Sequence, residues 1–230
     1  MIILAIETSC DKGSLALFRD GRMVESELDG VASHSEGVLS AIACLLADAG
    51  VSLSDLDGVA FGSGPGAFTG LRLACGIAQG LALGAGIGVC AVSSLDALAS
   101  QASAPRVLAA TDARLGEVYW RVYERRDGAT LQAIGEPSCS KPGEIDLPAG
   151  EWCGIGSAFA VHAEALQASL PGRLAGVCAT AVPRAADVAR LAAARVLNGE
   201  WAHPSKVAPL YVRDKVALTT AERLAAGGRA

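Results

Sequence analysis

The sequence contains few aromatic residues and few histidines. Phenylalanine, tryptophan and tyrosine make up 4% of the 230 residues, and the histidines are His34, His162 and His203. Histidine pairs that bind zinc usually stand about three to five residues apart, and no two of these histidines do. We therefore predict no metal site, and we interpret His34 and His203 as capping or surface residues.

Positive charge is also scarce. No lysine lies between Lys12 and Lys141, and 19 Lys and Arg against 24 Asp and Glu give a net charge of -5. The chain as a whole therefore lacks the positive field that nucleic-acid binding usually needs. If the protein serves an RNA, we expect a partner to supply the cationic surface.

The seven cysteines never form a C-x-x-C pair. Most of them stand beside Ala, Leu, Val or Gly, where a free thiol behaves as a small buried hydrophobic side chain. Scattered cysteines in odd number favour reduced, structural thiols over a disulfide framework. We therefore expect a cytoplasmic protein.

A long uncharged run extends from Leu73 to Leu95 and is long enough to span a membrane. Gln79 and the turn-forming "GAGIG" at 84–88 interrupt it, so we interpret it as a buried helix, a turn and a strand. No membrane partner is expected. The opening "MIILAIETSCDK" has no basic start, and it resembles a first strand more than a signal peptide.

Hydrophobic patterns in the first half predict a mixed sheet with helices on its faces. The opening predicts an antiparallel meander with a hairpin turn at Asp20-Gly21. Next comes a helix over 38–46, capped by Ser33 or Ser35 and ended by Gly50. The remaining elements are expected at 58–62 (strand), 69–84 (helix, capped by Thr69), 87–92 (strand) and 95–101 (helix).

The second half repeats the order of strands followed by helices. A Ser/Ala/Pro-rich stretch at 102–105 predicts a boundary, which divides the chain into domains 1–102 and 103–218 with a frayed tail at 219–230. We also predict a turn at 126–128, a local ion pair or cap at Asp112 and Arg114, and a last helix between Pro183 and Gly199.

The stretch "GSGPGAFTGLR", residues 62–72, looks like a phosphate-binding loop. A P-loop needs G-x-x-x-x-G-K-[ST], and the lysine is missing here. The dinucleotide fingerprint also fits poorly, because Pro65 lacks an amide donor. Neither nucleotide motif is satisfied. We predict structural roles for Thr69, as a cap, and for Arg72, as the partner of an acidic group or of carbonyls near the loop.

Three glycines, Gly76, Gly80 and Gly84, recur every four residues on one face of the predicted second helix. Each interior glycine costs about 0.8–1.0 kcal/mol relative to alanine, so we expect a close contact to offset that cost. The neighbour could be the protein's own sheet or a second chain, and the sequence leaves both open. The residues of the possible partner interface are Val38, Leu39, Ile42, Leu46, Leu73, Gly76, Ile77, Gly80 and Leu83.

The segment "GSGPGAFTGLRLACGIAQGLALG" closely resembles the glycine-rich motif of the bacterial TsaB family, which serves tRNA threonylcarbamoyladenosine biosynthesis. The likeness extends to the opening "ILAIETS", to "HSE" before the first helix, to "RVLAATDARLGEVYW" at 106–120 and to "PLYVRDKVA" at 209–217. Together these segments span nearly the whole chain, and their order makes the resemblance specific.

The resemblance implies a two-lobed α/β fold like that of actin, heat-shock ATPases and sugar kinases (the ASKHA superfamily), with a mixed sheet and helices in each lobe. It implies a non-catalytic subunit that pairs with the catalytic paralogue TsaD through first-lobe helices, and with itself when TsaD is absent. With the ATPase TsaE, such complexes transfer a threonylcarbamoyl group to adenosine 37 of tRNA. We therefore expect tRNA to be reached only through the complex.

The opening "IETSCD" at 6–11 is closer to the usual TsaD pattern than to the commoner TsaB pattern. A TsaD-like protein would carry an H-x-x-x-H metal pair and a longer chain, and this sequence has no such pair. "FTG" at 68–70 also belongs to the TsaB pattern. The resemblance therefore points to the non-catalytic paralogue.

ASKHA proteins hold phosphate in their first hairpin, so Thr8, Ser9, Gly64 and Gly66 are candidate nucleotide contacts, although a simple turn explains the composition equally well. No tightly bound cofactor is expected, and ATP or ADP at a complex interface stays open. The alternative function is a nucleotide-binding or hydrolytic, glycoprotease-like enzyme acting alone. The missing G-x-S-x-G elbow around Ser157 argues against its hydrolytic form.

Overall fold

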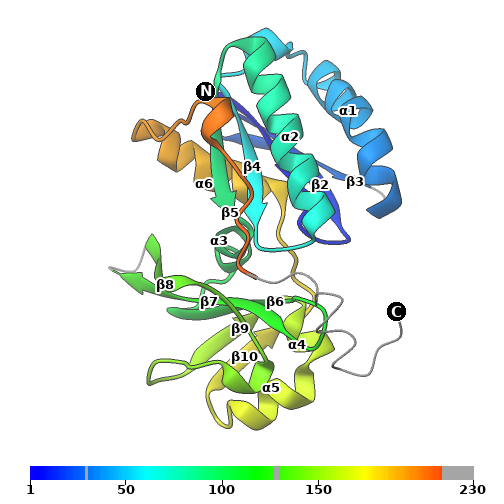
Figure 1. Ribbon diagram of the computed structural model, residues 1–230. Coiled ribbons are helices and arrows are strands. Elements are labelled where there is room, and N and C mark those ends of the chain that lie inside the picture. The colour runs from blue at the N-terminus through cyan, green and yellow to red at the C-terminus, as the bar shows by residue number, and fades with distance from the viewer. Residues whose placement is uncertain (29–30, 127–129, 214–230) are drawn as a thin grey trace, which may run out of the picture.

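The structure is a computed structural model that describes residues 1–28, 31–126 and 130–213. Two five-stranded sheets, each mixed and each packed with helices, make up the molecule (Figure 1). The predicted α/β class and the two-lobed architecture are confirmed. The predicted turn at 126–128 and the tail at 219–230 fall on or beyond the limits of the described residues.

The first sheet has the strand order β3-β2-β1-β4-β5. Its antiparallel part is the predicted meander, in which Asp20 and Gly21 both have positive φ in the turn between β2 and β3. The parallel part pairs β1 with β4 and β4 with β5. The strands are β1 (Ile2–Glu7), β2 (Gly13–Arg19), β3 (Arg22–Leu28), β4 (Gly58–Gly64) and β5 (Gly88–Ser93).

Helices cover both faces of this sheet, because successive strand residues alternate between two cores. Leu4 and Ile6 of β1 point to the core under α1 (Val31–Asp48) and α2 (Phe68–Ala85). Ile3 and Ala5 point to the opposite core under α6 (Ala185–Leu197). The short helices are α3 (Ser94–Ala99) and the 3₁₀ turns η1 (Leu53–Asp55), η2 (Pro142–Glu144) and η3 (Pro204–Lys206).

The second sheet has the order β10-β9-β6-β7-β8. Its core packs Leu108 and Trp152 of the sheet against Phe159 and Leu166 of two short helices, α4 and α5. The elements are β6 (Arg106–Asp112), β7 (Val118–Arg126), β8 (Thr130–Ser140), β9 (Trp152–Ile155), β10 (Leu174–Cys178), α4 (Ala158–Val161) and α5 (Ala163–Ser169).

The chain crosses between the sheets more than once. After the second sheet, α6 returns to the first sheet, and residues 204–213 then run along α2 toward the second sheet (Figure 1). We call residues 204–213 the strap. The division into domains 1–102 and 103–218 stays a prediction about independent folding units.

Both predicted side-chain caps are wrong. Helix α1 begins at Val31, so Ser33 and Ser35 lie inside it. Helix α2 has Ala67 at its N-cap position with no side-chain cap, and Thr69 lies inside its first turn. The predicted stop of α1 at Gly50 holds, since Gly50 has positive φ just after the helix. Helix α2 continues one residue past the predicted end at Gly84 and is capped by Gly86, which has positive φ and belongs to the same "GAGIG" stretch.

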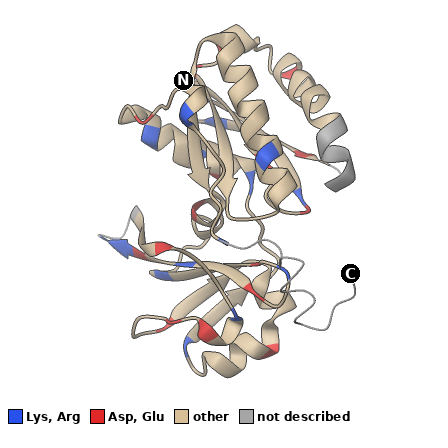
Figure 2. Ribbon diagram, viewed as in Figure 1, with Lys and Arg blue, Asp and Glu red and all other residues tan. Residues whose placement is uncertain are grey.

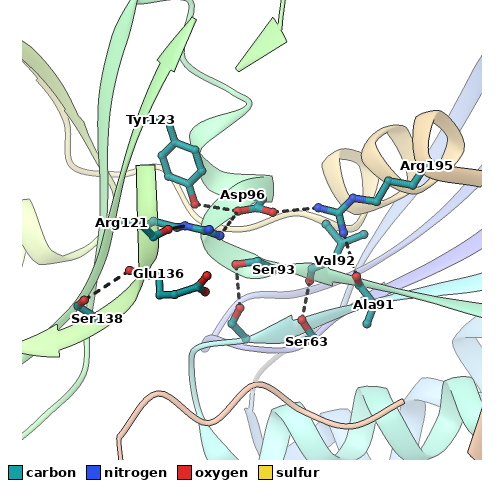
Figure 3. Close-up of polar contacts among 12 residues, drawn as sticks. Ser63, Ala91, Val92, Ser93, Asp96, Arg121, Tyr123, Glu136, Ser138 and Arg195 are labelled. Atoms are coloured by element: carbon teal, nitrogen blue, oxygen red, sulfur yellow. Dashed lines mark hydrogen bonds and ion pairs between the residues drawn. The ribbon is translucent and has the colours of Figure 1, made fainter. Parts of the chain in front are cut away.

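Asp96 of α3 joins the two sheets (Figure 3). Its carboxylate accepts hydrogen bonds from the Tyr123 hydroxyl at 2.9 Å and from Arg121 at 3.3 Å, both on β7 of the second sheet. Its other oxygen accepts from Arg195 of α6 at 3.0 Å. One carboxylate therefore ties α3, the second sheet and the helix behind the first sheet together.

A second buried carboxylate, Glu7, lies at the end of β1. Its oxygens accept hydrogen bonds from the Ser9 amide at 2.7 Å and from the Ser94 hydroxyl at 2.8 Å. Among the described residues, no lysine or arginine forms an ion pair with it. Burial raises the pKa of Glu7, because the charged form loses its hydration.

The difference in free energy of unfolding between the Glu7→Gln variant and the wild type is expected to shift in favour of the variant as the pH rises. The folded-state pKa of Glu7 lies above 4.5, so its stabilising contribution is fully present below the unfolded-state pKa and is lost as the pH rises through the folded-state pKa. Glutamine stays neutral throughout. Urea unfolding from acidic to neutral pH measures the gap, with Glu27→Gln on the exposed side of β3 as the control. A gap that is the same at every pH would contradict the prediction.

Asp96→Asn is expected to lower the free energy of unfolding by about 1–3 kcal/mol, since it leaves charged donors poorly paired. The amide nitrogen of asparagine would face the Arg195 or the Arg121 guanidinium. Urea unfolding measures the loss. The control is Asp11→Asn, because Asp11 pairs with Arg114 where both side chains are exposed, and such pairs contribute little. Equal losses in both variants would count against the role given to Asp96.

Candidate functional site

Helix α2 has two sides of small residues. Ala74, Ala78 and Ala82 are fully buried against the first sheet. Gly76 and Gly80 are exposed, and a Cβ atom added at either would meet no described atom within 4 Å. The sheet therefore takes the alanine side, and the protein's own sheet is not the neighbour of the glycine side.

The predicted interface residues divide between core and surface. Val38, Ile42 and Leu46 of α1 are buried in the core of the first sheet, so the prediction that they line an interface is wrong for this form of the chain. The exposed members are Leu39, Gly76, Gly80 and Leu83, and Leu73 and Ile77 are half-buried. Whether these remaining residues contact a partner stays a prediction.

The exposed surface of α1 and α2 carries little charge. Arg72 is the only charged residue of α2, and the two helices lie side by side with tan ribbon over most of α2 (Figures 1 and 2). The exposed positions from 37 to 48 of α1 are glycine, leucine, serine, alanine and cysteine, with one charged residue, Asp48, at the end of the helix. We call the exposed sides of α1 (37–48) and α2 the helix face. By length and composition, α2 could also cross a membrane, but its alanine side is packed on the first sheet.

We call residues 62–70, which run from the end of β4 into the start of α2, the glycine loop, and residues 8–12 between β1 and β2 the first turn. The glycine loop packs against the first turn. A Cβ at Gly70 would lie 1.8 Å from the Thr8 carbonyl oxygen, and one at Gly66 would lie 2.4 Å from the Ser9 carbonyl oxygen. A Cβ at Gly62 would lie 1.9 Å from the Glu7 carboxylate. These glycines therefore serve the approach of one backbone segment to another.

The candidate nucleotide contacts lie together, and the donors of Thr8, Ser9 and Gly64 form hydrogen bonds within the chain, whereas Gly66 lines the cleft described below. The Thr8 hydroxyl donates to the Gly70 carbonyl at 2.8 Å, and the Ser9 amide donates to Glu7. The Gly64 amide donates to the Ser94 hydroxyl at 3.2 Å. Thr8 and Ser9 are also buried. A phosphate bound here would have to displace these bonds.

Arg72 has partners that differ from those predicted. Its Nε donates to the Tyr211 hydroxyl at 3.0 Å, and its guanidinium carbon lies 3.9 Å from the centre of the Phe68 ring. The predicted pairing with an acidic group or with loop carbonyls is wrong. Tyr211 belongs to the strap, far away in the sequence, and no local pattern indicates it.

A cleft of about 440 Å³ lies beside the first turn. Its walls come from the first turn, the glycine loop, the turn between β6 and β7, and the end of the strap. Cys10 lines it, and burial together with the nearby Glu7 raises the pKa of the Cys10 thiol to about 11. A thiol with so high a pKa is a poor nucleophile at neutral pH.

Sequence reasoning missed one polar cluster on the wall of the cleft. His162 Nε2 lies 3.0 Å from Asp112 Oδ1, and the Asp112 amide donates to the Ser157 hydroxyl at 3.1 Å. Within the described residues, no hydrogen bond joins Ser157 to His162, so a serine nucleophile has no base beside it. The predicted ion pair of Asp112 with Arg114 is present at 3.5 Å.

The other histidine that the structure shows in detail is a cap. His203 Nδ1 accepts a hydrogen bond from the Ser205 amide at the start of η3, as interpreted. The side chain of His34 lies outside the described residues. Within the described residues, no three His, Cys, Asp or Glu side chains gather where a metal ion could bind.

Comparisons with known proteins cover nearly the whole chain. The family described as "TsaD: tRNA N6-adenosine threonylcarbamoyltransferase" matches residues 29–221. The tRNA threonylcarbamoyladenosine biosynthesis protein TsaB of Escherichia coli is 34% identical, with 94% of this chain and 96% of that protein covered. The TsaB protein of Haemophilus influenzae is 32% identical, with 94% and 95% covered.

A solved structure agrees with these relatives. YeaZ from Pseudomonas aeruginosa superposes with a TM-score of 0.83 at 35% identity, and the match covers 91% of this chain and 99% of that one. The chain therefore belongs to the TsaD family, in its TsaB (YeaZ) branch, whose named members serve tRNA threonylcarbamoyladenosine biosynthesis.

Proposed function

We propose that this chain is a non-catalytic subunit that docks, through the helix face, on a TsaD-like catalytic subunit. With a TsaE-like ATPase, the complex modifies adenosine 37 of tRNA, and tRNA is reached only through the complex. When the catalytic subunit is absent, two copies of this chain pair through the same face. The observation that carries the proposal is the exposed, nearly uncharged glycine side of α2.

The composition of the helix face supports an association between helices. Small side chains let two helix backbones approach to the short end of the usual 8–10 Å separation. A solvated helix surface normally carries charged residues, and the exposed side of α2 has only Arg72. Two neighbouring helices that both expose small residues offer a surface on which two helices of a related chain can pack.

The contacts around the cleft support the absence of catalysis by this chain alone. The Thr8 hydroxyl and the Ser9 and Gly64 amides are used internally, the Cys10 thiol has a high pKa, and within the described residues no hydrogen bond joins Ser157 to a base. A cytoplasmic location also stays part of the proposal, and the seven free thiols support it.

The Gly80→Arg variant is expected to fold but to lose binding to the TsaD-like subunit. The position is exposed with open space around it, so replacing glycine inside a helix should raise the free energy of unfolding by about 0.5–1 kcal/mol. The same arginine would hold a partner helix away, so co-purification with the TsaD-like subunit should be lost. Ala160→Arg, at an exposed position of α4, is the matched control and should keep binding.

Two measurements decide the outcome of this experiment. Urea unfolding shows whether Gly80→Arg is folded, and affinity capture of the co-expressed catalytic subunit shows whether it binds. A folded Gly80→Arg chain that binds as well as the Ala160→Arg chain would refute the proposed interface.

We further propose that ATP or ADP binds at the junction of the complex and not in the first turn of this chain alone. Because the Thr8 hydroxyl and the Ser9 amide are used internally, the isolated chain should give no binding heat when titrated with ATP and magnesium. The complex with the catalytic subunit should give heat. Binding by the isolated chain, lost in Ser9→Pro but not in Ser205→Ala, would contradict this assignment.

A further inference from the structure

The strap fastens to the first sheet and to α2 along most of its length. Gln79 of α2 donates from its side-chain nitrogen to the carbonyls of Pro204 at 3.0 Å and of Val207 at 3.1 Å. Further on, the Leu210 amide donates to the Ser63 carbonyl at 2.7 Å. Residues 204–210 of the strap are therefore bound to the first sheet and to its helix α2 (Figure 1).

The end of the strap crosses to the second sheet. Arg213 donates to the carbonyls of Ala113 at 2.9 Å and of Arg114 at 3.3 Å, and to the Glu117 carboxylate. All three acceptors lie in the turn between β6 and β7. A single guanidinium therefore holds this turn to a segment anchored on the first sheet.

The turn that Arg213 holds has an unfavourable backbone. Arg114 and Leu115 have φ of 61° and 56°, in the left-handed region that costs about 1–2 kcal/mol for a residue other than glycine. Leu115 is also one of the most exposed large apolar side chains, at 83%. Contacts from outside the turn must favour this conformation, and Arg213 supplies such contacts.

The same turn and the end of the strap form two walls of the cleft that Cys10 lines. Movement of the turn away from the first sheet would widen the cleft. The other contact of the strap in this region is Tyr211, whose ring lies 5.4 Å from the Phe68 ring and whose hydroxyl accepts from Arg72.

We propose that the strap is a latch between the two sheets: Arg213 holds the turn between β6 and β7 against the first sheet, and its release opens the cleft. Arg72 stands four residues before Gly76 on the exposed side of α2, and it donates a hydrogen bond to Tyr211 of the strap. A partner docked on the helix face would therefore affect the latch through Arg72 and Tyr211. That last link rests on the proposed function, whereas the latch itself is a property of the isolated chain.

Cys10 is a reporter of the opening within the native sequence. In the isolated full chain, Arg213→Ala removes three hydrogen bonds and should raise the rate at which iodoacetamide labels Cys10 at least about tenfold, the factor expected for the loss of even one hydrogen bond of a charged group. Peptide mass mapping follows each thiol separately. Cys75 and Cys90 lie in the cores of the first sheet and should stay protected, which shows that the variant is folded.

The matched control is Arg173→Ala. Arg173 also donates to several carbonyls, those of Gly150, Leu147 and Pro148, but all of them lie away from the cleft. Its loss should leave the Cys10 rate at the wild-type value. Equal acceleration of Cys10 in both variants would show general loosening of the second sheet and would overturn the latch.

A second variant keeps the test decisive if Arg213→Ala exposes Cys75 and Cys90 as well. Tyr211→Phe removes the bond from Arg72 and keeps the ring on Phe68, so it should accelerate Cys10 labelling by a smaller factor while Cys75 stays protected. Wild-type Cys10 rates in the folded variants would refute the proposal. Because no partner protein is present, the result does not depend on whether the helix face binds TsaD.

Discussion

The contact between the glycine loop and the first turn is the constraint on which the rest of the structure depends. Because Gly70 and Gly66 have no side chains, the backbone at the start of α2 lies directly against the carbonyls of Thr8 and Ser9. This contact fixes the N-terminal end of α2 on the end of β1. The helix then has one orientation on the sheet, with Ala78 inward and Gly80 outward.

The same contact also leaves fewer free hydrogen-bond donors in the first turn for an anion. The loop takes up the Thr8 hydroxyl and closes over Glu7, a buried carboxyl group that forms no ion pair with any described residue. A phosphate would meet the negative or protonated Glu7 group and donors that are already engaged. By contrast, the outer side of α2 is not covered by any described residue at Gly76 and Gly80. One packing arrangement therefore weakens the case for a nucleotide site and supplies the helix face.

The sequence predicts local features of this fold well and distant ones poorly. The meander, the hairpin turn at Asp20 and the end of α2 within the stretch 84–88 follow from short patterns, and the structure confirms them. The caps fail because helices can begin without a side-chain cap when tertiary packing fixes their ends, as at Ala67. The pairing of Arg72 with Tyr211 joins residues 139 positions apart, so no local pattern contains it.

The partner residues show a related limit. Helical spacing identifies an apolar side of α1, but an apolar side can face either a core or a partner, and Val38 and Ile42 face the core. The four-residue spacing of glycines is more informative, because each interior glycine lowers helix stability by a known amount and therefore calls for a compensating contact. The sequence does not say whether the protein's own sheet or another chain makes that contact. The position of the sheet, which only the structure shows, excludes the sheet.

The exposed glycines therefore give the strongest argument for a partner. Gly76 and Gly80 each lower helix stability by about 0.8–1.0 kcal/mol relative to alanine, and an alanine Cβ at either position would meet nothing in the described chain. The fold alone would be more stable without them. A residue that costs helix stability and meets no described atom supports the proposal that a second backbone packs closely on this side of α2.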